Sequence, residues 1–142
     1  MKKLVTLLLS TLLFSGCAAS PSASPSTTDP TSDSTSPSTN TYRRISMEEA
    51  VAMMERESGY IILDVRRADE FAAGHIPGAI NVANESIGTE EIPQLPDKQQ
   101  LILVYCRSGR RSKEAAEKLV KLGYTNIVEF GGILDWKGEI EA

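Results

Sequence analysis

Short runs of mostly apolar residues recur along the C-terminal two-thirds of the chain, separated by polar and glycine-containing segments. Runs of this length, with few polar interruptions, are typical of strands that are buried on both faces of a sheet. The sequence therefore predicts four buried strands, at Tyr60–Leu63, Ala79–Val82, Leu101–Tyr105 and Asn126–Phe130.

Two segments between these runs have apolar residues at helical spacing. The first follows a capping box formed by Ser46 and Glu49, and we expect it to end at Gly59. The second covers Ser112–Leu122 and is closed by Gly123. Buried strands that alternate with helices indicate an α/β fold, in which a mostly parallel central sheet is flanked by helices.

Two shorter helical segments are also expected. Asp69 has the position of an N-cap for a turn that ends at Ala73, before Gly74. Gly131–Gly132 turns the chain into a short last helix that carries Trp136. We expect the indole of Trp136 to pack in the core or at its rim.

A single cysteine, Cys106, follows directly on the third predicted strand. Ligands bind outside the carboxyl ends of parallel strands, so a functional group is expected at this position. Backbone N–H groups at the start of the next helix, its dipole and several guanidinium groups favour a negative charge on the sulfur. We interpret Cys106 as an activated thiolate, and the alternative is an inert core cysteine. The residues expected to surround it are Arg107, Ser108, Gly109, Arg110 and Arg111.

Composition limits what this thiolate can do. The formal net charge is −4, which argues against nucleic-acid binding. The chain has one histidine and two cysteines, too few for a multi-histidine metal site or a disulfide framework, and no spacing resembles a zinc site. We therefore expect no metal ion and no cofactor, and we interpret His75 as a structural turn residue.

The N-terminus has the pattern of an export signal. Lys2–Lys3 precedes an apolar run, Leu4–Phe14, that is shorter than the about 20 residues needed to span a bilayer. Leu13–Cys17 resembles the bacterial lipobox, in which Cys17 would be acylated. Ordinary signal cleavage after Ala19 is the alternative. Either way we predict an extracytoplasmic protein of the bacterial cell envelope, and the lipobox predicts a lipid anchor to the membrane.

The chain is accordingly predicted to have three parts. Residues 1–16 form a lipoprotein signal peptide, and residues 17–41 form a disordered Ser/Thr/Pro linker that follows the lipid anchor. From Ala18 onward this linker has no side chain large enough for a core, so burial cannot offset the entropy lost on ordering. Residues 42–142 form the folded domain.

Four motifs of the folded part resemble those of a rhodanese (sulfurtransferase) domain, in its order and at its spacings. They are Leu63–Arg66, Glu70–Phe71 with Gly74–Ala79, Cys106–Ser112, and Gly131–Ile133 with Trp136. The resemblance implies a three-layer α/β fold and a cysteine that carries a transferable sulfur as a persulfide. It also implies a small anionic donor such as thiosulfate, an acceptor such as cyanide or a thiol, and ping-pong kinetics.

The loop after Cys106 has the features that this chemistry needs. The N–H groups of Arg107 to Arg111 can converge on an anionic sulfur, and Gly109 permits the backbone angles of a closed loop. Arg107 and Arg110 would attract an anionic donor. Arg111 closes the loop, and it either orients the loop or forms an ion pair within the fold.

Asp64 and Arg66 follow the first predicted strand and are interpreted as structural support. We expect them to tie the strand end to neighbouring loops by ion pairing and capping.

Two other functions compete with sulfur transfer. Cysteine phosphatases and arsenate reductases place one residue more between cysteine and arginine than the four between Cys106 and Arg111. A shorter loop makes a smaller cradle, which suits one sulfur atom better than a tetrahedral phosphate. The second alternative is a non-catalytic relay or binding module that exchanges sulfur with a protein acceptor of the cell envelope.

Overall fold

The computed structural model describes residues 41–142. The predicted signal peptide, the lipidation site Cys17 and the predicted linker before Thr41 lie outside the described residues, and they stay predictions. Within the described part of the chain, no helix is long and apolar enough to cross a membrane. The helices are α1 (Met47–Arg56), α2 (Ala68–Ala72) and α3 (Arg110–Lys121), with single 3-10 turns η1 (Asn84–Ser86) and η2 (Ile133–Asp135).

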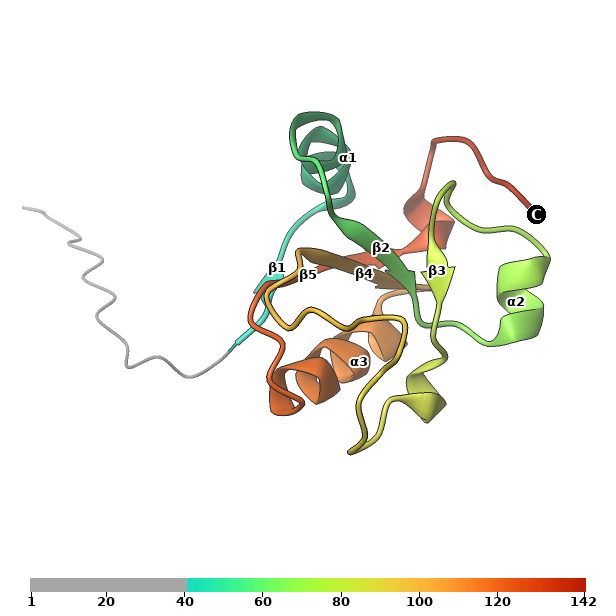
Figure 1. Cartoon of the computed structure of the whole chain (residues 1–142). Coiled ribbons are helices and arrows are strands. Elements are labelled where there is room, and N and C mark those ends of the chain that lie inside the picture. The colour runs from blue at the N-terminus through green and yellow to red at the C-terminus, as the bar shows by residue number, and fades with distance from the viewer. Residues whose placement is uncertain (1–40) are drawn as a thin grey trace, which may run out of the picture. The chain divides into compact units, whose positions relative to one another are not determined.

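One five-stranded sheet forms the centre of the domain, in the order β1-β5-β4-β2-β3 (Figure 1). Every neighbouring pair is parallel, so all carboxyl ends lie along the same edge of the sheet. This edge is where ligands bind in sheets of this type. The strands are β1 (Arg43–Arg44), β2 (Ile61–Asp64), β3 (Ile80–Asn81), β4 (Ile102–Cys106) and β5 (Ile127–Gly132).

Helices cover both faces of the sheet (Figure 1). On one face, Ala116 and Leu119 of α3 pack in an apolar cluster with β2, β4 and β5. On the other, Ala50 and Met53 of α1 pack in a second cluster. β4 is buried along its whole length and contributes alternate side chains to the two clusters, as the pleat of a strand requires. The predicted α/β fold with a parallel central sheet is confirmed.

The capping box at the start of α1 is present as predicted. Glu49 donates its backbone N–H to the Ser46 hydroxyl oxygen at 3.2 Å, and Ser46 donates its N–H to the Glu49 carboxylate at 2.8 Å. The helix ends at Arg56, and Gly59 follows in a left-handed conformation.

The two short helices differ from the prediction. α2 begins at Ala68, so the expectation that Asp69 is its N-cap is wrong. Asp69 instead pairs with the side chain of Arg67, and Glu70 accepts the N–H of Arg67 at 3.3 Å. The last helix is only the 3-10 turn η2, with Trp136 directly after it.

α3 begins at Arg110, two residues before the predicted start at Ser112. Arg110 and Arg111 carry no part of the apolar stripe, so hydrophobic spacing could not mark the first turn of this helix. Both arginines therefore lie in the first turn of α3, and the loop between β4 and α3 is shorter than predicted.

β4 and β5 both extend beyond the predicted apolar runs, to Cys106 and Gly132. Their pairing changes register between Val104, opposite Glu129, and Cys106, opposite Gly132. β5 thus contains one extra residue, which is the property of a β-bulge. Gly131 lies in this irregular part, with a φ of +98°.

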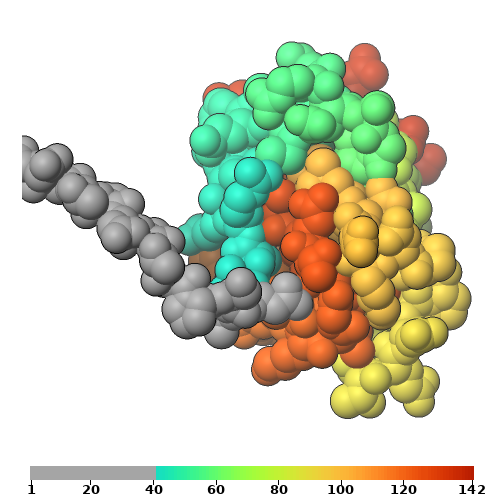
Figure 2. Space-filling model, turned by 60° about the vertical axis from the view of Figure 1, so that its left-hand side comes forward, coloured from blue at the N-terminus to red at the C-terminus, as the bar shows by residue number. Residues whose placement is uncertain are grey.

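β1 was not predicted, because its two arginines have no apolar pattern. It pairs with β5 at the edge of the sheet that Figure 2 views, with Arg44 opposite Glu129. The N–H of Ile45 extends this pairing by donating to the carbonyl oxygen of Glu129 at 3.0 Å. The described chain therefore enters the fold as an edge strand.

Candidate active site around Cys106

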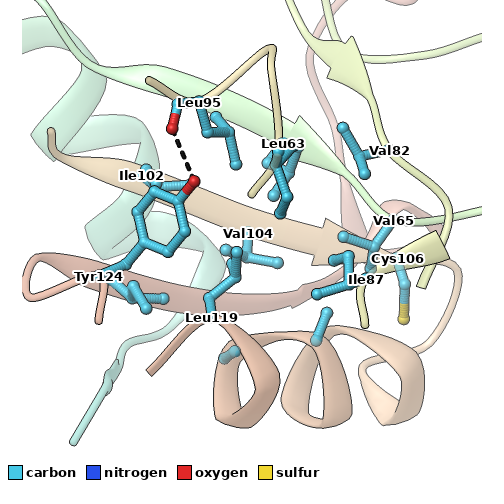
Figure 3. Packing of buried hydrophobic residues seen from close by; sticks show 14 residues of the cluster. Leu63, Val65, Val82, Ile87, Leu95, Ile102, Val104, Cys106, Leu119 and Tyr124 are labelled. Carbon is cyan, nitrogen blue, oxygen red and sulfur yellow. Dashed lines mark hydrogen bonds between the residues drawn. The ribbon is translucent and has the colours of Figure 1, made fainter. Parts of the chain in front are cut away.

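Cys106 is the last residue of β4, and its side chain belongs to the cluster on the α3 face. Figure 3 shows it at the margin of this cluster, at the carboxyl end of the strand. Only 1% of the residue is exposed. The backbone N–H of Gly109 donates to the sulfur at 3.1 Å. The sulfur is thus nearly enclosed, and one backbone donor is already directed at it.

Gly109 turns the chain from β4 into α3. It is the N-cap of α3 and has a φ of +95°, a left-handed conformation that glycine adopts without steric cost. The first turn of the helix supplies unpaired N–H groups and the positive end of the helix dipole at this point. Both favour an anionic sulfur on Cys106.

Gly132 allows the Cys106 loop to lie directly on β5. A β-carbon at this position would be 2.2 Å from the carbonyl oxygen of Arg107 and 2.5 Å from the α-carbon of Ser108. No atom other than hydrogen fits in this space. The sequence marked Gly131–Gly132 only as a turn, so this requirement at the Cys106 loop was missed.

Arg111 is held by α2. Its two terminal nitrogens donate to the carboxylate of Glu70 at 2.6 and 2.9 Å. These bonds lower the pKa of Glu70 from 4.5 to about 2, although partial burial opposes the shift. Pairing with Glu70 also raises the pKa of Arg111, although burial opposes the shift, and a thiolate on Cys106 would act in the same direction as Glu70. Arg111 thus joins the loop to α2 while its charge acts on the sulfur.

Glu70 was quoted in the sequence only as part of a motif and was given no role. It lies 41 positions before Arg111. No local pattern signals a pairing over such a separation.

Asp64 and Arg66 form a buried ion pair, with the closest contact at 2.6 Å. The same guanidinium group donates to the carbonyl oxygen of Gly74 at 2.7 Å. Asn81 donates its side-chain amide to the carbonyl oxygens of both Asp64 and Arg66. These contacts join β2, β3 and the segment after α2, and they involve no atom of the Cys106 loop.

Three residues of the loop, Arg107, Ser108 and Arg110, are exposed. Arg110 donates to Glu114, one turn along α3, at 2.7 Å. The backbone carbonyl of Arg107 accepts the N–H of Leu134 at 3.3 Å, which attaches the loop to η2. The guanidinium groups of Arg107 and Arg110 therefore lie at the exposed rim, the second of them paired with Glu114, while the thiol is buried.

His75 is engaged away from the loop. Its ring stacks on Phe71 with centroids 3.7 Å apart, and its Nδ1 lies 3.0 Å from the Phe71 carbonyl oxygen. Its Nε2 lies 3.3 Å from a carboxylate oxygen of Glu141. These contacts hold the turn after α2 against the C-terminal segment.

Comparison with known proteins agrees with this architecture. A family model of the rhodanese-like domain matches residues 46–139. The chain belongs to the rhodanese-like sulfurtransferase family. It is 35% identical over 97 residues to a thiosulfate sulfurtransferase of Pseudomonas entomophila, covering 68% of this chain and 85% of that protein.

Two further similarities come from Escherichia coli. The chain is 36% identical over 73 residues to a thiosulfate sulfurtransferase of this organism, covering 51% of this chain and 70% of that protein. A solved structure, a rhodanese with anions, has a TM-score of 0.53 and 34% identity, and the match covers 58% of this chain and 96% of that one. The rhodanese-like fold expected from the motifs is therefore confirmed.

Replacing Gly132 with alanine should displace the Cys106 loop. The added β-carbon collides with backbone atoms, which cannot move aside as a flexible side chain can. We expect a loss of about 1–3 kcal/mol in the free energy of unfolding, measured with urea, together with faster alkylation of the unburied thiol. Gly88→Ala is the matched control, because a β-carbon at Gly88 meets nothing within 4 Å. Equal stability of the two variants would contradict the close-approach argument.

Replacing Glu70 with glutamine should produce a pH-dependent loss of stability. A carboxyl group whose folded pKa is lowered stabilises the fold above its unfolded pKa, and this contribution is lost as the pH falls to the folded value. The difference between wild type and Glu70→Gln should be constant above about pH 5 and vanish as the pH approaches 2. Urea unfolding at several pH values measures it.

Glu57→Gln is the control for this series, since it removes a carboxylate from an exposed pair with Arg56. Exposed pairs contribute little to stability, so its effect should be small. A Glu70→Gln effect that is the same at pH 3 and pH 7 would show that charge pairing with Arg111 is not its cause.

Proposed function

We propose that this protein is a sulfurtransferase that carries sulfur on Cys106 as a persulfide. The observation that supports this function best is the segment Cys106–Arg111, from the end of β4 to the first turn of α3, in which the Gly109 N–H is directed at a nearly enclosed sulfur. Helix α3 begins in the same segment and adds its positive dipole end. Such a site stabilises an anionic sulfur, which is the group that both the thiolate and the persulfide present.

In the first step, the Cys106 thiolate attacks the outer sulfur of a thiosulfate-like donor. A bond forms between the two sulfur atoms as the S–S bond of the donor breaks, and sulfite leaves with the electron pair. The terminal sulfur of the resulting persulfide carries the negative charge. The exposed guanidinium groups of Arg107 and Arg110 attract the anionic donor, and the Escherichia coli relative solved with anions is consistent with this charge.

In the second step, a thiophilic acceptor attacks the terminal sulfur. Cyanide leaves as thiocyanate, and a thiol acceptor leaves as a persulfide. In either case the S–S bond to Cys106 breaks and the thiolate is restored. Donor and acceptor use the same site in turn, so ping-pong kinetics are expected.

Hydrolysis of phosphate or reduction of arsenate is disfavoured by the same loop. A cysteine-dependent phosphatase needs an arginine whose nitrogens surround the oxyanion. Both terminal nitrogens of Arg111 donate to Glu70. The loop is also shorter than a phosphate cradle, which leaves a sulfur atom as the better-fitting occupant.

Replacing Cys106 with serine in the full chain should abolish sulfur transfer from thiosulfate to cyanide, measured as thiocyanate. A serine hydroxyl is a weak nucleophile for sulfur and cannot hold a persulfide. Cys17→Ala controls for the loss of a thiol and should remain active. Thiocyanate formation by Cys106→Ser would overturn the proposal, as would turnover of p-nitrophenyl phosphate by the wild type that depends on Cys106.

Detection of the persulfide separates the enzyme from a relay module. Mass spectrometry after incubation with thiosulfate detects a persulfide at Cys106, and later addition of cyanide should remove it. A persulfide that forms but resists cyanide would instead favour delivery to a protein thiol.

We also propose that a lipid on Cys17 anchors the protein at the extracytoplasmic face of a bacterial membrane. The support is the lipobox-like sequence Leu13–Cys17 after a short apolar run. In this arrangement the domain meets small donors and envelope proteins outside the cytoplasm.

Cys17→Ala should move the protein from the membrane fraction to the soluble fraction, with its thiosulfate activity unchanged. Fractionation followed by the thiocyanate assay measures both properties. An unchanged membrane fraction would contradict the lipid anchor without affecting the proposal for Cys106.

A further inference from the structure

Glu129 of β5 is a carboxylate with no exposed side-chain surface, and the proposed transfer does not use it. One oxygen, Oε2, accepts from Arg44 Nε at 3.1 Å. The other, Oε1, accepts from the Ser112 hydroxyl at 2.6 Å and from the N–H of Gly131 at 3.0 Å. A buried carboxylate is costly unless it is paired and hydrogen-bonded, and these three donors provide both.

The partners of Oε1 lie on α3 and on β5, next to Arg107–Gly109, the sulfur-binding loop that follows Cys106. Ser112 is in the first turn of α3, and its hydroxyl oxygen lies 3.0 Å from the carbonyl oxygen of Gly109. Gly131 lies in the irregular part of β5, and its α-carbon would be 3.6 Å from a β-carbon on Gly109. Oε1 therefore binds one group from the helix that Gly109 caps and one from the part of β5 against which Gly109 is packed.

We propose that Glu129 is a positioning residue for the sulfur-binding loop. By holding Ser112 and Gly131 together through Oε1, it fixes the position of Gly109, whose N–H is directed at Cys106. It does not touch the sulfur itself. The inference rests on the proposed use of the Cys106 thiolate and names a residue that sets the reactivity of this thiolate.

Arg44 has a separate part in this arrangement. A negative charge close to the loop would by itself disfavour a thiolate on Cys106. Arg44 neutralises it through Oε2, from the two-residue edge strand β1. The first strand of the described chain is therefore linked to the loop through one ion pair.

The charge of Glu129 and its positioning of the loop affect the Cys106 thiolate in opposite directions, which makes the proposal testable. Glu129→Leu removes both the charge and the acceptor, so loss of the charge alone would favour the thiolate, whereas loss of positioning disfavours it. Glu129→Gln removes the charge but keeps an oxygen that can accept from Ser112 and Gly131. Only a positioning role predicts that the leucine and glutamine variants differ in direction.

The readout is the rate at which iodoacetamide alkylates Cys106 as a function of pH, after reduction of the protein. For Glu129→Leu we expect the pH midpoint to rise by about one unit, with alkylation near neutral pH about tenfold slower. For Glu129→Gln we expect a midpoint at or below that of the wild type. A midpoint for Glu129→Leu that is unchanged or lower overturns the proposal, and so does a glutamine variant that matches the leucine variant.

Ser112→Ala keeps the test decisive if Glu129→Leu does not fold, since it removes only the hydroxyl between Glu129 and Gly109. It should also raise the midpoint, and an unchanged midpoint overturns the proposal. Where both variants fold by circular dichroism, the double variant should shift no more than the larger single shift, because the two groups act in one chain. Additive shifts would overturn the proposal.

Arg44→Gln and Arg43→Gln form a matched pair for the charge contribution. Both remove one exposed arginine of β1, but only Arg44 contacts Glu129, whereas Arg43 contacts the sulfur of Met53. Arg44→Gln should raise the alkylation midpoint and Arg43→Gln should not; equal midpoints would overturn the part assigned to Arg44. Alkylation needs no sulfur donor, so these results stand even if thiosulfate transfer fails.

Discussion

The close approach of the Cys106 loop to β5 is the constraint on which the site depends. The loop backbone lies so near Gly132 that no side chain fits between them. The β-bulge in β5 brings Gly132, not the residue before it, opposite Cys106. With the strand end held in this way, the chain reverses at Gly109, whose N–H is directed at the sulfur, and α3 starts at the next residue.

Charged residues hold the elements around this loop in place. Glu70 joins α2 to Arg111, and Glu129 joins β5 to both β1 and α3. Asp64 and Arg66 do the same for β2 and the segment after α2, away from the loop. Buried ion pairs often add little net stability, because desolvation offsets attraction. Their value here is geometric, since Glu70, Glu129 and Arg66 each bind a group from a segment that only the fold brings near.

The strands and the main helices could be predicted wherever burial leaves an apolar pattern. β2, β4 and the body of α3 follow this rule, and so does the position of Cys106 at the carboxyl edge. β1 and the first turn of α3 could not, because arginines form both. Asp69 was misjudged as a cap because Arg67 and Glu70 satisfy this helix start through contacts that spacing does not show.

The sequence by itself determined the alternation of buried strands with helices, the family motifs and the one described cysteine that a helix start can activate. Periodicity and composition carry this information locally. Only the tertiary structure decided that Glu70 holds Arg111, that Gly132 admits the loop, and that Glu129 lies beneath it. These contacts join segments far apart along the chain. They depend on register and packing distance, which no local pattern records.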